Sequence, residues 1–164
     1  MIRPALAFSA ITFLAAMASG QASVQVEPTT FQGPRPLARQ TATAVVRDYL
    51  EAWQSMSAAL QQNRPDLLNQ DFVGAAKDKL TATISAQAKQ GITTRWVARS
   101  HDVQIIFYSP EGLSIQLADN VDYDLELLDH DKVLATAPIH ARTIAVLTPT
   151  EVRWKVRVLE TGPR

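Results

Sequence analysis

The chain has 164 residues, of which 46% are hydrophobic and 20% charged, and it contains no cysteine. This length suits one domain, and the lack of cysteine excludes disulfides, thiolate metal sites and thiol nucleophiles. Sixteen basic residues balance sixteen acidic ones, so a domain that holds nucleic acid by charge is disfavoured.

The first residues have the three parts of a secretory signal peptide. Arg3 gives a basic start, residues 5–18 are apolar apart from one serine and one threonine, and small residues follow. We therefore expect residues 1–22 to be a cleaved signal peptide and the mature domain to be periplasmic or secreted. Cleavage removes Arg3 and leaves a net charge near minus one. The alternative is an uncleaved N-terminal anchor, although a membrane span needs ~20 apolar residues, and no span is expected in the mature chain.

Residues 23–42 predict an extended linker, because they contain prolines and a glycine and show neither a helical nor a strand period. A helix is predicted from Ala44 to Gln62, with Thr41 or Thr43 as its N-cap. Apolar residues recur there at steps of three and four, so one face of this helix is expected to be buried. That face is formed by Val46, Leu50, Trp53, Met56 or Ser57, and Leu60.

A short helical turn is predicted at residues 65–68, and a second long helix from Phe72 to Gln90, with Asp71 as its N-cap and Gly91 at its end. After Gly91 the apolar period changes to two, and short turns separate the segments, which predicts antiparallel hairpins. The expected strands are Arg95–Tyr108, Leu113–Leu128, Lys132–Leu147 and Glu151–Leu159.

This order predicts an α+β domain over residues 43–160, followed by a tail at 161–164. The helices are expected to cover one face of a four-stranded meander. The other face should carry solvated charges, which are Asp122, Asp124 and Glu126 on one strand and Arg153, Lys155 and Arg157 on another.

Four polar residues are expected on the face that meets the helices. Short turns fix the register, and this register puts Asp102 opposite Asp119, Asp119 opposite Arg142, and His140 one step along the same strand. Polar groups on a covered face need partners. One interpretation is an ion pair at the open end of the sheet.

The other interpretation is a ligand pocket between sheet and helices, to which Tyr123 and Trp154 also contribute. Pro138 bears on both interpretations, because a proline inside a strand removes a ladder hydrogen bond and can mark a bulge that shifts later residues to the other face.

The helix pattern Val46-x-x-Tyr49-Leu50-x-x-Trp53, the second helix ending at Gly91-Ile92, and the long-stranded meander resemble the NTF2-like superfamily, also called the SnoaL-like or cystatin-like α+β barrel. The resemblance covers about residues 43–159. It implies a curved sheet that wraps around the helices into a cone with an internal pocket. The superfamily includes ketosteroid-isomerase-like enzymes, polyketide cyclases, dehydratases and non-enzymatic binding or assembly domains, so the fold alone does not decide the function.

The isomerase-like enzymes use a carboxylate base on the sheet, and a tyrosine with a protonated acid as an oxyanion hole. By this resemblance, Asp102 or Asp119 would be the base and Tyr49 or Tyr123 the donor. An arginine at position 142 beside these acids would favour their ionised form and so conflicts with a neutral acid.

Metal and triad chemistry are not expected. The three histidines, His101, His130 and His140, lie far apart in the sequence, with His130 in a turn and His101 facing outward. Ser100-His101-Asp102 is contiguous, whereas a triad needs side chains that converge from separate positions.

The leading hypothesis is an exported, non-catalytic domain without a cofactor that binds a small molecule or a protein partner, and a homodimer through the sheet fits the same pattern. The alternatives are a small isomerase or dehydratase, and a structural domain of an envelope assembly. If the protein is an enzyme, we expect a closed pocket with Asp119 at its wall. If it is a binding domain, we expect either a pocket that contains no acid at its apolar end or an exposed apolar patch on the sheet. If it is a structural domain, we expect a filled core and no pocket.

Overall fold

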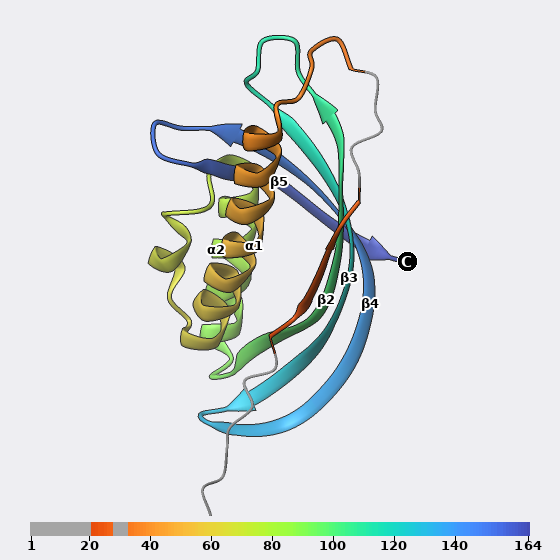
Figure 1. The fold of residues 1–164 in the computed structure, drawn as a ribbon. Helices are drawn as coiled ribbons and strands as arrows, with labels where there is room; N and C mark the ends of the chain where they lie inside the picture. The colour runs from red at the N-terminus through yellow and green to blue at the C-terminus, as the bar shows by residue number, and fades with distance from the viewer. Residues whose placement is uncertain (1–20, 28–32) are drawn as a thin grey trace, which may run out of the picture.

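The computed structural model describes residues 21–27 and 33–164, so the predicted signal peptide lies outside the described residues except for Gln21 and Ala22. Two long helices and a short 3-10 helix lie on the concave side of one curved sheet (Figure 1). In the described part of the chain, the convex side carries no helix. The α+β class is confirmed, with five strands in place of four.

The strands follow each other across the sheet in the order β1-β2-β3-β4-β5. The first pair is parallel and the other three are antiparallel. The strands are β1 Ser23–Val26, β2 Thr93–Tyr108, β3 Ile115–Asp129, β4 Lys132–Pro149 and β5 Trp154–Pro163.

Strand β1 corrects the prediction that residues 23–42 contain no strand. It pairs with residues 100–103 of β2, which are distant in sequence. Four exposed residues give no alternation that a sequence pattern could reveal. At the other end of the chain, β5 continues through most of the predicted tail, to Pro163.

Helix α1 runs from Arg39 to Gln62 and so begins earlier than predicted. Neither Thr41 nor Thr43 caps it, because the N-cap residue is Ala38, whose side chain cannot accept a hydrogen bond. The 3-10 helix η1 at Pro65–Leu68 is as predicted. The predicted apolar face is confirmed in its main members, since α1 buries Val46, Trp53, Met56 and Leu60, to which the structure adds Val45, Tyr49, Ala52 and Ala59.

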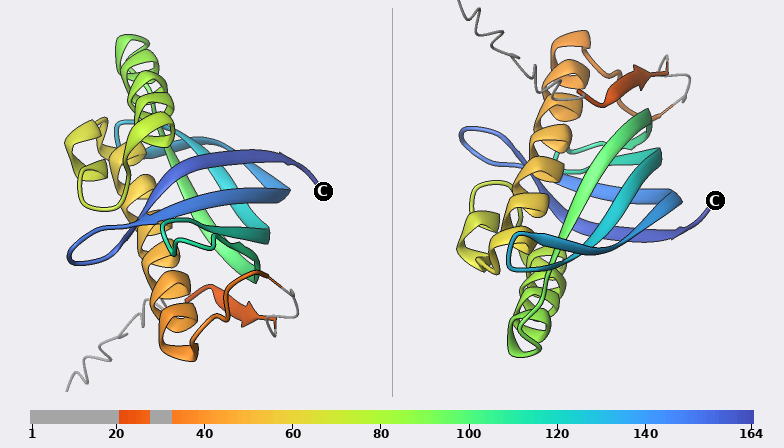
Figure 2. Two further views of the ribbon diagram at one scale, coloured as in Figure 1. Left: turned by 90° about the horizontal axis from the view of Figure 1, so that it is seen from above. Right: turned by 90° about the horizontal axis from the view of Figure 1, so that it is seen from below.

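Helix α2 runs from Gly74 to Lys89. The predicted cap Asp71 does not cap it, because the N-cap position is Val73. The segment before α2 instead lies along the outer edge of β5, where the Val73 N–H donates to the Val156 carbonyl at 3.0 Å and the Val156 N–H donates to the Asp71 carbonyl at 2.8 Å. Helix α2 then extends past the sheet beside β5 (Figure 2).

The Asp71 side chain is buried and contacts groups from two other parts of the chain. It forms an ion pair with Arg153 and accepts a hydrogen bond from Ser55. The Arg153 guanidinium also lies 3.2 Å from Glu51 of α1. Arg153 was predicted on the solvated face, and this prediction is wrong: it joins α1 and the segment before α2 to the β4–β5 connection.

Bulges change the predicted register. In β4, Ala135 pairs with Leu127 while Val133 pairs with Leu128, so Leu134 is an extra residue. A one-residue slip moves every later side chain to the opposite face. Arg142 therefore pairs with Asn120 and faces outward, whereas the prediction placed it inward.

A second bulge, between Ile105 and Phe107, has the same effect in β2. Tyr108 is buried as predicted, but beyond the bulge His101 faces the helices and Asp102 faces outward. Both orientations are the reverse of the prediction. Pro138 does not cause a bulge: β5 pairs with β4 only up to Ala141, so Pro138 lies in an edge segment of β4, where a missing N–H is tolerated.

Candidate functional site

A buried carboxylate lies where α1 crosses the inner face of the sheet, which is the face that meets the helices. Asp119 of β3 has 0% of its surface exposed. Its Oδ2 atom accepts a hydrogen bond from the Tyr49 hydroxyl at 2.9 Å and lies 2.7 Å from Nδ1 of His101. Its Oδ1 atom accepts the backbone N–H of Asp102 at 3.1 Å. These partners satisfy the carboxylate without a cation from lysine or arginine.

The hydrogen bonds assign the imidazole tautomer. An ionised carboxylate only accepts hydrogen bonds, and Asp119 already accepts them from Tyr49 and Asp102. With Asp119 as the acceptor, the proton between His101 and Asp119 is assigned to Nδ1, and in the neutral form of the imidazole the lone pair is then on Nε2. Among the described residues, Nε2 has no hydrogen-bond partner.

Tyr49 is held in its neutral form. Burial raises the pKa of its hydroxyl well above the usual value, and the negative charge of Asp119 raises this pKa further. The Trp53 N–H lies close enough to oppose the rise, but within the described part of the chain it has no hydrogen-bond partner of acceptable geometry. Tyr49 is thus a stable donor to Asp119.

Aromatic rings fill the space beneath α1. The Trp53 ring meets the His101 imidazole edge-on at a centroid distance of 5.2 Å. The Trp96 ring is stacked on Tyr123 at 4.8 Å, with 8° between the planes, and lies 5.8 Å from Trp53. The resemblance implied a pocket inside the cone, whereas these rings occupy the region where α1 meets the sheet.

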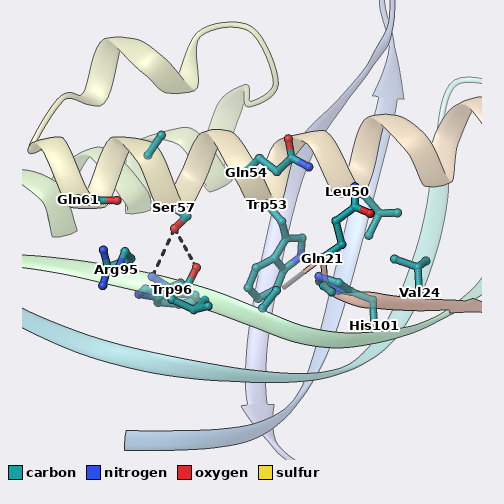
Figure 3. Close-up of a pocket in the computed structure, with 14 residues that line it drawn as sticks. Gln21, Val24, Leu50, Trp53, Gln54, Ser57, Gln61, Arg95, Trp96 and His101 are labelled. Carbon is teal, nitrogen blue, oxygen red and sulfur yellow. Dashed lines mark hydrogen bonds between the residues drawn. The ribbon is translucent and has the colours of Figure 1, made fainter. Parts of the chain in front are cut away.

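An open groove of about 720 Å³ lies beside these rings, between α1 and β2 (Figure 3). Helix α1 contributes residues that recur along one face for three turns, and the start of β1 with the two residues before it lines one side. The lining contains no aspartate or glutamate. The residues are Gln21, Ala22, Val24, Leu50, Trp53, Gln54, Ser57, Ala58, Gln61, Arg95, Trp96, Val97, Ala98 and His101.

Two polar groups of the groove are already engaged. The Ser57 hydroxyl donates to the Trp96 carbonyl at 2.8 Å and accepts from the Trp96 N–H at 3.3 Å, the two contacts dashed in Figure 3. It thereby takes the place of a neighbouring strand at this edge of β2. The Arg95 guanidinium is bound to Glu126 through Nε at 2.6 Å and Nη2 at 2.5 Å.

His101 connects the buried carboxylate to the groove. It is 4% exposed and lines the groove while it contacts Asp119. Figure 3 shows its ring directed into the space beside Trp53. Sequence reasoning missed this residue, because the bulge that turns it inward leaves no mark in the local alternation of apolar residues.

The structure brings two of the seven predicted site residues into contact, Tyr49 and Asp119, and places Tyr123 against Trp53 and Trp96. Tyr49, Asp119 and Tyr123 lie on the inner side of the sheet. The pocket interpretation of Asp102, His140 and Arg142 required that they face the helices, and they face outward instead. Trp154 is partly buried at the start of β5, where its backbone N–H donates to Asp48 at 2.8 Å.

The predicted ion pair between Asp119 and Arg142 is absent from the described structure. His140 instead lies 2.7 Å from Asp122 on the outer face, and this contact lowers the pKa of Asp122. Among residues 21–27 and 33–164, no group of three acidic or histidine side chains is placed to hold a metal ion. None of the helices in this part of the chain is long and apolar enough to cross a membrane.

Solved structures share this architecture. The intermembrane-space region of the chloroplast protein ARC6 superposes with a TM-score of 0.65 at 15% identity, over 79% of this chain and 100% of that one. A scytalone dehydratase candidate from Novosphingobium aromaticivorans gives 0.52 at 14% identity, over 77% and 89%. Aln2 from a Streptomyces species gives 0.51 at 12% identity, over 79% and 94%.

The chain has the NTF2-like fold. The resemblance inferred from element order and helix pattern is therefore confirmed at the level of fold. No protein-family model and no curated protein matches the sequence. Because an NTF2-like fold supports enzymes as well as binding domains, the function must be argued from the groove and from the Asp119 cluster, by which we mean Asp119, His101 and Tyr49.

Proposed function

We propose that this NTF2-like domain is an exported, non-catalytic binding domain whose groove between α1 and β2 holds a small molecule or a segment of a partner protein. Support for export comes from the leader pattern of residues 1–22, whose cleavage would remove Gln21 and Ala22 from the groove lining and leave the walls formed by α1, β2 and Val24. The observation that carries the binding function is the composition of the groove, which combines tryptophan and aliphatic walls with glutamine amides and has no carboxylate.

The state of the buried acid supports binding over catalysis. An enzyme of the isomerase type needs a carboxylate that reaches its substrate. Asp119 is fully buried, accepts hydrogen bonds from Tyr49, His101 and the Asp102 backbone, and is not part of the groove lining. Its contacts are those of a group that holds neighbouring side chains in place.

A groove-filling variant tests the proposal. Ala58 lines the groove, is half-buried and is not part of the buried core, so Ala58→Trp should fill the groove without disturbing the core. Ala86→Trp, on the exposed face of α2, is the matched control. The probe is anilinonaphthalene sulfonate, whose fluorescence rises in apolar sites. We expect the folded protein and the Ala86→Trp variant to bind it, and Ala58→Trp to lose most of the signal. Equal signals from all three would contradict a binding groove.

A second candidate function is a small lyase or isomerase, favoured by one observation. His101 lines the groove and its Nδ1 atom is held by Asp119 at 2.7 Å, which is the arrangement of an oriented general base. To separate the two functions, a molecule that binds in the groove is incubated with the protein for a long time, recovered and analysed by mass spectrometry. An unchanged mass supports binding. Conversion that is lost in His101→Asn supports the enzyme.

A further inference from the structure

We propose that His101 selects what the groove binds, through an Nε2 atom that accepts a hydrogen bond from a hydroxyl or N–H donor on an aromatic or apolar molecule. This inference rests on the proposed function, because it takes the groove as the binding site. It adds the chemical class of ligand and the residue that recognises it.

The imidazole is fixed before any ligand arrives. Asp119 accepts the Nδ1–H at 2.7 Å, and its other two donors, Tyr49 and the Asp102 backbone, keep the carboxylate in place. Tyr49 and Trp53 both meet the ring edge-on, at 6.4 Å and 5.2 Å between centroids. A ring held on several sides cannot turn to offer Nδ1, so Nε2 is the atom left for the groove.

The other polar groups of the groove do not discriminate in this way. Ser57 is occupied by both backbone groups of Trp96, and Arg95 is bound to Glu126. The amides of Gln54 and Gln61 carry donor and acceptor atoms together, so they serve either kind of ligand group. His101 is therefore the fixed acceptor of the groove.

The surroundings make an unmatched Nε2 costly. His101 is 4% exposed, and Trp53 and Leu50 stand beside it in the groove lining. A ligand without a donor displaces water from Nε2 and leaves this nitrogen without a hydrogen bond. A ligand with a donor replaces the lost hydrogen bond to water with one of its own. Sites built around such a group reject the analogue that lacks the matching donor. A flat apolar body suits the tryptophan walls.

The test compares two probes of similar size, a naphthol and the fluoronaphthalene that carries fluorine at the same ring position. Binding to the folded protein is followed by the chemical shifts of the imidazole nitrogens, with the His101 signals identified by their loss in His101→Asn. We expect Nδ1 to be protonated and Nε2 not, the naphthol to bind at least about tenfold more tightly, and only the naphthol to move the Nε2 signal. Equal affinities would overturn the inference.

Two variants separate recognition from simple damage to the fold. His101→Asn keeps an amide near the place of Nδ1, so it retains a partner for Asp119 and removes Nε2. It should bind both probes equally, with a melting temperature close to that of the parent protein. Asp119→Asn presents an amide donor to Nδ1 and drives the proton to Nε2, so the nitrogen shifts of His101 should report a protonated Nε2, and the naphthol can then bind Nε2 only as an acceptor. An unchanged preference for the naphthol in His101→Asn, or an unprotonated Nε2 in Asp119→Asn, would refute the role of His101.

The results also distinguish this inference from the proposed function. If anilinonaphthalene sulfonate binds in the groove and is blocked by Ala58→Trp, but the naphthol shows no advantage, the groove stands and the role of His101 falls. If none of the probes binds, both proposals fail together.

Discussion

His101 of β2 and Asp119 of β3 meet side chain to side chain at 2.7 Å, although the register partner of Asp119 is Val103. Both side chains point to the inner face, and the imidazole reaches along the sheet to the carboxylate two positions away. Diagonal neighbours of this kind are within reach of long side chains in antiparallel sheets. The contact leaves one imidazole nitrogen for the groove and the other for the core.

Substitution of Asp119 should weaken the fold. In Asp119→Asn, an amide nitrogen replaces the oxygen that accepts from Tyr49 and His101, so the imidazole must change its tautomer and the buried Tyr49 hydroxyl loses its acceptor. We expect the free energy of unfolding to fall by about 1–3 kcal/mol, measured by urea denaturation.

Asp102→Asn is the matched control. The Asp102 carboxylate lies on the outer face, is partly exposed, and makes no hydrogen bond within the described residues. Its replacement should change stability by no more than about 0.5 kcal/mol. Equal losses in the two variants would show that the Asp119 cluster does not contribute to stability.

The fold could be predicted from the sequence wherever local patterns decide it. The spacing of Trp53, Met56 and Leu60 indicates a helix, and the short connections at residues 129–131 and 148–150 indicate hairpins. Strand β1 could not be predicted, because its four exposed residues owe their conformation to a partner far along the chain.

The site could be predicted only in part, because alternation holds between bulges and reverses at each of them. Strand β3 alternates without interruption from Ile115 to Tyr123, so the inward orientation of Asp119 was predicted correctly. The bulges at Ile106 and Leu134 reversed His101 and Arg142. Bulges depend on how two strands fit together over the core, and neither of these has a glycine or proline to mark it.

Loss of Arg153 should destabilise the junction between α1 and β5. Arg153 is the cationic partner of Asp71, whose side chain is 3% exposed, and it also contacts Glu51. In Arg153→Met the aliphatic stem remains while the buried carboxylate loses its ion pair. The Arg153 side chain is 20% exposed, so solvent partly screens the ion pair. We therefore expect the free energy of unfolding, measured by urea denaturation, to fall by about 2 kcal/mol.

Arg157→Met serves as the comparison, since Arg157 is exposed and forms no ion pair in the described structure. Its effect should stay within about 0.5 kcal/mol. A parallel loss in both variants would mean that net charge, and not the contact with Asp71, is responsible.

Ser57→Ala should uncover an edge of the sheet. The hydroxyl satisfies both the N–H and the carbonyl of Trp96, which point away from β3. Without it we expect a loss of about 1 kcal/mol and, because exposed strand edges pair with other chains, more aggregation in light scattering. Ser85→Ala is the control, since Ser85 bonds only to a carbonyl of its own helix. Aggregation equal to that of the control would contradict an edge-capping role.

Alkaline unfolding should report on Tyr49. In the folded protein, burial and then the charge of Asp119 raise the pKa of Tyr49 well above the value of about 10 expected for an unfolded chain. The unfolded state therefore loses its proton first as the pH rises. The stability linked to Tyr49 is fully present below about pH 10 and is lost as the pH climbs toward the folded pKa.

Urea denaturation at several pH values above about 9 checks this sign. The free energy of unfolding should fall with pH in the parent protein and fall less steeply in Tyr49→Phe, which has no proton to lose at that position. Tyr123→Phe provides the comparison, because burial alone raises the pKa of Tyr123 and no carboxylate adds to the shift. It should reduce the slope less than Tyr49→Phe does. The same slope in the parent and in Tyr49→Phe would mean that the Tyr49 hydroxyl titrates as freely in the folded protein as in the unfolded chain, and its hydrogen bond to Asp119 would then not exist in solution.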